Sequence, residues 1–189
     1  MKNLLGMLAF AFVLISSCSE ISKEKAPLVS EVNLKVRHID ANHRVQILED
    51  DFHLGDSIYK VRGYFMDGML LKLVGVLYTT HIERDDYFYF ENKKQIFSGH
   101  VVVSRDDRLA SEYKYYYGKD GSIEEALYWQ DKYKTGKQFP HEHFEEFEPN
   151  IDSLKESEET RLQFFMDKLD MDGFEIHHLN ENREANIVR

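Results

Sequence analysis

The sequence predicts an α+β domain: about six antiparallel strands in a meander, a C-terminal helix packed on the sheet, and a second helix as one alternative near the N-terminus. Three observations carry this prediction. Between residues 57 and 130, aromatic and β-branched residues gather in segments of strand length, separated by turn-forming residues. Three of these turns resemble one another. Residues 152–172 carry the apolar spacing of a helix.

Length and charge narrow the class of protein. The 189 residues suit one domain with its own core, which we place at residues 31–189. The formal net charge of −10 argues against a nucleic acid partner and against a basic patch that binds anionic lipid. A basic protein partner from the envelope or the medium is compatible with this charge. No glycine-rich phosphate loop and no nucleophile elbow occurs, so we assign no catalytic residue and expect no cofactor.

The first residues, 1–17, have the organisation of a secretory signal. Lys2 supplies a positive charge, and a largely apolar run from Leu4 to Ile15 follows. The run is 12 residues long, whereas a helix needs about 20 apolar residues to cross the hydrocarbon core. We therefore expect this segment to be cleaved off and not to remain in the membrane.

The residues before Cys18 resemble the lipobox of bacterial lipoprotein precursors. Ile15, Ser16 and Ser17 are an aliphatic residue and two small ones directly before the cysteine. The resemblance implies cleavage before Cys18, a diacylglyceryl group on its thiol and a further acyl group, such as palmitate, on its amino group. Several acyl chains anchor a protein stably. Cys18 is the only cysteine, which agrees with an envelope protein that forms no disulfide.

The residues after Cys18 favour the outer membrane. Ser19 and Glu20 are polar, and no aspartate follows the cysteine as it does in enterobacterial lipoproteins retained at the inner membrane. The acidic and polar stretch resembles the export tags of Bacteroidota surface lipoproteins. It is compatible with attachment to either leaflet of the outer membrane. Residues 18–30 are rich in Ser, Glu and Lys, which predicts a flexible tether.

The segment from Glu31 to Phe52 fits two structures. Val32 and Leu34 begin an alternation that is typical of a strand. The same segment also places apolar residues near one face of a helix, and we favour the helix. The positions on that face are Val32, Val36, Ile39, His43 and Ile47.

Six strands are predicted within residues 57–130. They are bounded by Gly, Asp, Asn and Ser, and each is rich in aromatic or β-branched residues. The expected strands are Ile58–Met66, Met69–Thr80, Arg84–Glu91, Gln95–Ser104, Ser111–Tyr117 and Ser122–Gln130.

Three of the turns share a pattern: an aromatic pair, a tight turn, and an aliphatic residue soon afterwards. They begin at Tyr64, Tyr89 and Tyr116, at spacings of 25 and 27 residues. Asp-Gly in two of them suits a type I′ hairpin turn, and the second has Asn92-Lys93 instead. The unit resembles the hairpins of YD-type and MORN-type repeats and of uncharacterised bacterial envelope proteins. That resemblance implies an antiparallel meander and says little about function.

The C-terminal helix is predicted at residues 152–172. Ser153 and Glu156 have the spacing of a capping box. Further along, an apolar face spaced i, i+3, i+4 and i+7 should pack on the sheet, and Gly173 is placed to end the helix. That face consists of Leu162, Phe165, Met166 and Leu169.

His141 and His143 form the strongest candidate for chemistry. Two imidazoles near Glu145 and Glu146 could hold a divalent metal, and on a strand they would share one face. The pair departs from the metalloprotease helix motif, because position 145 is glutamate. A solvated acidic loop is the alternative, and we favour it.

Tyrosines alternate along two predicted strands, for example at Tyr87 and Tyr89 and at Tyr113 and Tyr115. Exposed, they would form a platform for a glycan or a protein. Buried under a helix they would belong to the core, and we favour the core because a sheet covered on both faces needs aromatic residues on both.

Three functions remain open. We favour a lipid-anchored, non-catalytic binding or structural module of the envelope, whose ligand is unknown. An inhibitor or immunity protein against a basic enzyme or toxin is the second alternative, and acids clustered around one groove would favour it. A metal-dependent hydrolase at His141 and His143 is the third, and His and carboxylates converging in a pocket would favour that function.

Overall fold

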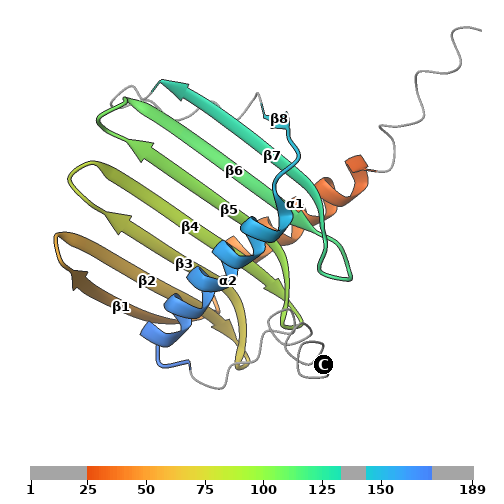
Figure 1. Ribbon diagram of the computed structural model, residues 1–189. Helices are drawn as coiled ribbons and strands as arrows, with labels where there is room; N and C mark the ends of the chain where they lie inside the picture. Colours follow the sequence, from red (N-terminus) through yellow and green to blue (C-terminus); the bar gives the residue numbers. More distant parts are fainter. Residues whose placement is uncertain (1–24, 133–143, 172–189) are drawn as a thin grey trace, which may run out of the picture.

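The computed structural model describes residues 25–132 and 144–171, which form one antiparallel sheet between two helices. Each strand pairs with its neighbours in the sequence, so the sheet is a meander (Figure 1). In order the elements are α1 (Lys25–Asp40), β1 (Gln46–Leu54), β2 (Ser57–Met66), β3 (Met69–Tyr78), β4 (Ile82–Glu91), β5 (Lys94–Ser104), β6 (Leu109–Tyr117), β7 (Ile123–Lys132), β8 (Glu145–Glu146) and α2 (Ile151–Lys168). The α+β class, the meander and both helices are confirmed, with eight strands in place of about six.

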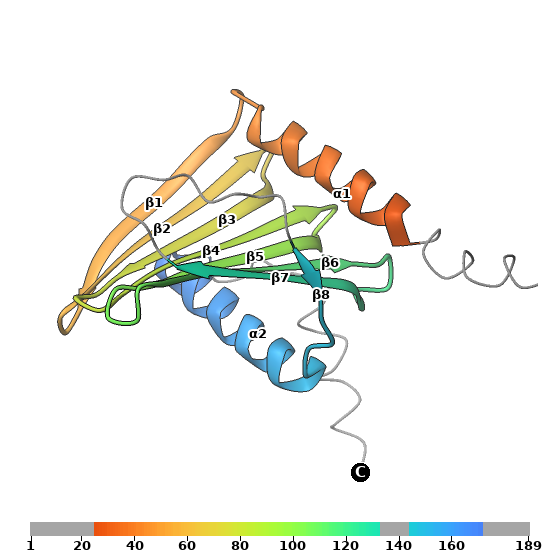
Figure 2. The same ribbon diagram turned by 90° about the horizontal axis from the view of Figure 1, so that it is seen from above.

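The two helices lie on opposite faces of the sheet (Figure 2). Their apolar faces cover two separate clusters, because successive side chains of a strand point to opposite faces. The buried members under α2 are Val61, Phe65, Leu70, Leu73, Phe88 and Phe90, together with Leu162, Phe165, Met166, Leu169 and Met171. Under α1 the buried members are Val32, Tyr89, Phe97 and Tyr116.

The repeated aromatic pairs coincide with irregularities in the strand pairing. Register shifts fall within Tyr64/Phe65, within Tyr89/Phe90 and within Tyr116/Tyr117, one in each repeat. Such a bulge increases the local twist of a strand. The repeat seen in the sequence is therefore a repeated bulged hairpin, and each pair places one aromatic ring on each face of the sheet.

The turns that follow use the left-handed backbone region. Asp67 and Gly68 have φ of 52° and 77°, and Asn92 and Lys93 have φ of 51° and 65°. Two consecutive residues with positive φ define the type I′ hairpin turn. The second repeat therefore keeps the turn geometry without a glycine, since asparagine adopts this region more readily than most residues.

The N-terminal segment contains both of the structures that its sequence fits. Helix α1 buries Val32 and places Val36 and Ile39 against the sheet, as the helical pattern predicted. The prediction that the helix continues through His43 and Ile47 is wrong, because β1 begins at Gln46. The helix also begins at Lys25, so residues 25–30 are helical and do not belong to a flexible tether.

Helix α2 confirms the predicted apolar face but not the predicted ends. The N-cap is Asn150, whose side chain accepts a hydrogen bond from the backbone N–H of Ser153, so the proposed capping box at Ser153 is wrong. The helix ends at Lys168, before Gly173, and Asp170 takes the left-handed conformation with φ of 53°. Among the described residues, neither helix combines the length and apolarity needed to span a membrane.

Candidate binding site

A network of buried polar side chains lies between α2 and the sheet. Its centre is Glu158, which is 4% exposed and points from α2 onto β5 and β6. Ser98 donates to Glu158 Oε1 over 2.5 Å, and Gln95 donates to Oε2 over 3.1 Å. Tyr117 also donates a short hydrogen bond to Oε2. Each carboxylate oxygen therefore has partners, as a buried charge requires.

His100 joins this network to the neighbouring strand. The ring is 3% exposed, and Nδ1 lies 2.6 Å from Asp86 Oδ1 while Nε2 lies 2.8 Å from Glu158 Oε1. Asp86 and His100 are directly opposed in the pairing of β4 with β5, so strand register alone brings them together. The ring is thus held between two carboxylates that come from different elements.

The two carboxylates are ionised at neutral pH. Burial acts to raise the pKa of Asp86, but the hydrogen bond and the charge of His100, with Arg84 and Arg161, outweigh it, and the pKa is lowered. The pKa of Glu158 is lowered in the same way, because the hydrogen bond and charge of His100 outweigh its burial. An ionised carboxylate only accepts hydrogen bonds, and each ring nitrogen of His100 faces one such acceptor.

Two arginines lie beside Asp86. Arg84 Nε donates to Asp86 Oδ1 over 2.9 Å, and Arg161 Nε lies 3.8 Å from the same oxygen. Arg161 also donates from Nη1 to Ser157 Oγ over 2.6 Å. Burial and the neighbouring charge of Arg84 lower the pKa of Arg161. Two guanidinium groups and the imidazole of His100 therefore gather around one carboxylate oxygen, Asp86 Oδ1.

A hollow of about 370 Å³ lies over these arginines, between the first turns of α2 and strands β4 to β6. Arg84, His100 and Arg161 contribute to one side of it. Tyr113, Tyr115, Val102, Phe147, Pro149, Asn150, Ser153, Leu154 and Ser157 complete the lining. A volume in this range accommodates a small molecule. The ligand-binding residues left unknown by the sequence can therefore be assigned here as candidates.

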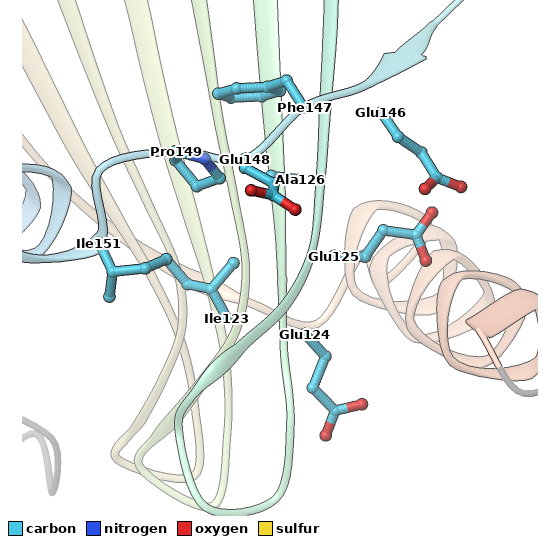
Figure 3. A pocket seen from close by; sticks show the side chains of 9 residues that line it. All are labelled: Ile123, Glu124, Glu125, Ala126, Glu146, Phe147, Glu148, Pro149 and Ile151. Atoms are coloured by element: carbon cyan, nitrogen blue, oxygen red, sulfur yellow. The ribbon is translucent and has the colours of Figure 1, made fainter.

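A second hollow has the opposite character. It measures about 580 Å³ and lies between β7 and the segment that leads into α2. Four glutamates line it: Glu124, Glu125, Glu146 and Glu148. In Figure 3 the carboxylates of Glu125 and Glu146 point toward one another. One end of the sheet therefore holds an acidic hollow and an arginine-lined hollow side by side, with Phe147 and Pro149 lining both.

The predicted lipidation and metal sites cannot be placed relative to the two hollows. Cys18, His141 and His143 lie outside the described residues, so lipidation and metal binding stay predictions. Within residues 25–132 and 144–171, no group of three His, Cys, Asp or Glu side chains has the arrangement of a metal site. The tyrosine prediction is confirmed for the core, since Tyr89 and Tyr115 are 4% and 5% exposed.

The residues of the network escaped sequence reasoning. Ser98 and His100 alternate with the rest of a strand as solvent-facing residues would, and Glu158 sits in a strongly polar stretch of helix. The positions of these residues relative to others in the sequence could have identified them. In the predicted meander, Asp86 and His100 fall opposite one another, and Glu158 lies four residues before Leu162 on the apolar face of α2.

Comparison with known proteins gives no match. No protein-family model, no curated protein and no solved structure is significantly similar to the chain. Function therefore has to be argued from the site itself.

Proposed function

We propose that the protein is a lipid-anchored envelope protein that acts as a non-catalytic binding module, with the arginine-lined hollow as its binding site. One observation carries the binding proposal. Arg84 is held at the hollow by its hydrogen bond to Asp86, and Arg161 by its hydrogen bond to Ser157, before any ligand arrives. Preorganised polar groups bind with less loss of conformational entropy.

The chemistry of the hollow favours binding over catalysis. A general base needs a nitrogen or oxygen that can reach the substrate with a free lone pair. Both ring nitrogens of His100 are held by carboxylates, at 2.6 and 2.8 Å. Histidine and carboxylates do converge, but the carboxylates face the ring and not the hollow. This arrangement supports a binding module over the metal-dependent hydrolase considered from the sequence.

The anchor rests on the lipobox residues Ile15 to Cys18. Lipid on Cys18 would hold the domain at the outer membrane, and the membrane would be its first partner. Replacing Cys18 by alanine should move the protein from the membrane pellet to the soluble fraction and abolish labelling with an alkyne-tagged palmitate. Unchanged pelleting in carbonate without label incorporation would contradict the proposal.

The binding proposal is tested by filling the hollow. Ser157 is exposed on α2 and lines the hollow, so Ser157→Trp should block it; the change removes the hydrogen bond from Arg161 but none of the contacts of His100 or Glu158. Gln163→Trp adds the same ring at an exposed position of α2 away from the hollow and serves as the control. Native mass spectrometry of the full protein, incubated with small molecules extracted from the envelope, should show a bound ligand in the wild type and in the control only. Equal ligand occupancy in Ser157→Trp would contradict the proposal.

The acidic hollow supports a second candidate function, an inhibitor or immunity protein against a basic enzyme or toxin. Four glutamates around one hollow are the arrangement expected for capture of a basic protein surface. Such an association should weaken steeply with salt. Replacing Glu124 and Glu148 by glutamine should slow association with a basic partner, measured by surface plasmon resonance at two ionic strengths. An association rate that changes neither with the glutamine substitutions nor with ionic strength would contradict this candidate function.

A further inference from the structure

We infer that the arginine-lined hollow binds the carboxylate of a small ring-containing acid. The carboxylate would lie between Arg84 and Arg161, and the ring would lie against Tyr113, Tyr115 and Phe147. This inference rests on the proposed binding function and defines the ligand class for the same hollow.

The lining of the hollow selects for negative charge. The chain has 34 acidic residues against 24 lysines and arginines, yet none of the 12 lining residues is Asp or Glu. Two of the 12 are arginines. Among the described residues, the carboxylates beside these arginines are Asp86 and Glu158, which are buried and hydrogen-bonded to His100. The hollow is thus a local site of positive potential on an acidic protein.

The arginines have donors left for a ligand. Arg84 uses Nε for Asp86, and among the described residues its two terminal nitrogens make no hydrogen bond. Arg161 uses Nη1 for Ser157, and among the described residues its Nη2 makes no hydrogen bond, whereas its Nε is buried. A guanidinium offers donors in a planar fork that matches a carboxylate. An arriving carboxylate would also relieve the repulsion between the two arginines.

The two guanidinium groups favour a singly charged ligand. A carboxylate brings one negative charge and matches the planar fork of a guanidinium. A phosphate dianion would bring two negative charges close to the buried carboxylates of Asp86 and Glu158. The first turn of α2, capped by Asn150, adds the partial positive charge of a helix N-terminus on the same side.

The opposite wall of the hollow is aromatic. Phe147 packs edge-on against Tyr113 and Tyr115, with ring centroids 6.1 and 6.0 Å apart. Burial and the charge of Glu158 raise the pKa of Tyr115 to about 12, so its hydroxyl stays neutral and can donate a hydrogen bond. Aromatic side chains offer rigid contact area to a ring and a polar tip to its substituents.

Isothermal titration calorimetry of the full protein in detergent tests the inference. The probes are benzoate and glucuronate, their neutral counterparts benzamide and glucose, and inorganic phosphate. The variants are Arg84→Gln, Arg84→Lys and Arg161→Gln, with Arg62→Gln as the matched control, because Arg62 pairs with Glu49 outside the hollow. Circular dichroism verifies that each variant is folded.

We expect at least one carboxylate to bind about tenfold more tightly than its neutral counterpart, because hydrogen bonds to charged groups contribute about 1.5–3 kcal/mol. Arg84→Gln and Arg161→Gln should each weaken that binding about tenfold. Arg84→Lys, which keeps the charge but loses the fork, should give an intermediate loss, and Arg62→Gln none. Stronger binding of benzoate would identify an aromatic acid, and stronger binding of glucuronate an acidic sugar.

The inference is overturned if neither carboxylate binds saturably, if the neutral probes bind equally well, or if phosphate binds more tightly than both acids. It is also overturned if a ligand lost in Ser157→Trp carries no carboxylate. In that last case the proposed binding function stands, so the two failures are distinguishable. Loss of the co-purifying ligand in both Ser157→Trp and Arg84→Gln would support function and ligand class together.

Discussion

Helix α2 covers two kinds of surface along its length. From Leu162 onward it buries Phe165, Met166 and Leu169 in the apolar core with Leu73 and Phe88. One turn earlier, Glu158 enters the hydrogen-bonded network of Asp86 and His100. The same helix therefore covers an apolar core toward its C-terminus and a charged network closer to its N-terminus.

The difference shows which end stabilises the fold and which end serves a site. Burying one large apolar side chain contributes about 1.5–3 kcal/mol. A buried ion pair contributes little net stability, because desolvation of the charges offsets their attraction. The charged end is therefore better explained by what it holds in place, the arginines at the hollow, than by stability.

The largest expected effect is loss of a partner within the network. Glu158→Ala should lower the free energy of unfolding by about 3–5 kcal/mol, because His100 and its hydrogen-bonding neighbours would remain buried without an acceptor. Phe165→Ala should lose a similar amount by leaving a cavity. Urea unfolding measures both, and Glu156→Ala at an exposed position of α2 is the control. A loss below about 1 kcal/mol for Glu158→Ala would remove the contrast between the two ends.

A smaller effect is expected where α2 approaches the sheet most closely. Gly75 on β3 lies under Phe165, and an added Cβ would meet the ring Cζ at 2.1 Å. Gly75→Ala should therefore destabilise the protein by about 1–3 kcal/mol through overpacking. Phe165→Leu in the same chain should recover part of this loss, which thermal unfolding of the double variant would show. Strictly additive losses would mean that the ring moves away freely.

The charged end should also make stability depend on pH. The pKa values of Asp86 and Glu158 are lowered in the folded protein from their ordinary values of 3.8 and 4.5. Their contribution is therefore present above about pH 4.5 and is lost as the pH falls through the folded pKa values. Each pH unit between the unfolded and the folded pKa corresponds to about 1.4 kcal/mol of stability. Glu158→Gln should reduce the loss of stability at acid pH, measured by urea unfolding at a series of pH values. An unchanged dependence of the free energy of unfolding on pH would mean that other groups cause this loss.

The smallest effect should come from the ion pairs that hold α1. Lys35 donates to Glu91 over 2.7 Å and lies 2.9 Å from Glu31, with a third of its side chain exposed. Exposed pairs contribute about 0.2–1 kcal/mol, so Lys35→Met should change stability by less than about 1 kcal/mol. The unfolding midpoint, measured over a range of salt concentrations, tests this change in stability. A loss above about 1 kcal/mol would mean that the ion pairs of Lys35 hold α1 more strongly than exposed pairs usually do.

The sheet could be predicted because its signals are local. Strands β2 to β7 alternate aromatic and β-branched residues between turns, and period and turn residues are properties of short segments. Strand β1 was not predicted because three consecutive acids, Glu49 to Asp51, interrupt the alternation of apolar and polar residues. Strand β8 has only two residues, which leaves no period to detect.

The candidate site could not be predicted in the same way, because it depends on tertiary packing. Glu158 is separated from His100 by 58 residues and reads as one of many acids on a polar helix. Helical spacing places this glutamate on the same face as Leu162, but only the packing of α2 shows which strand residues it meets. A buried polar group becomes recognisable once its partners are known.

The strictly sequential strand order also constrains how the chain can fold. Every strand pairs with its predecessor along the chain, so each hairpin can close over a short loop as it emerges, with little loss of loop entropy. Helix α1 emerges first but packs on residues of β4 to β7, so it has to wait for most of the sheet before it can dock. Helix α1 is therefore expected to reach its final place late, after the strands on which it packs have formed.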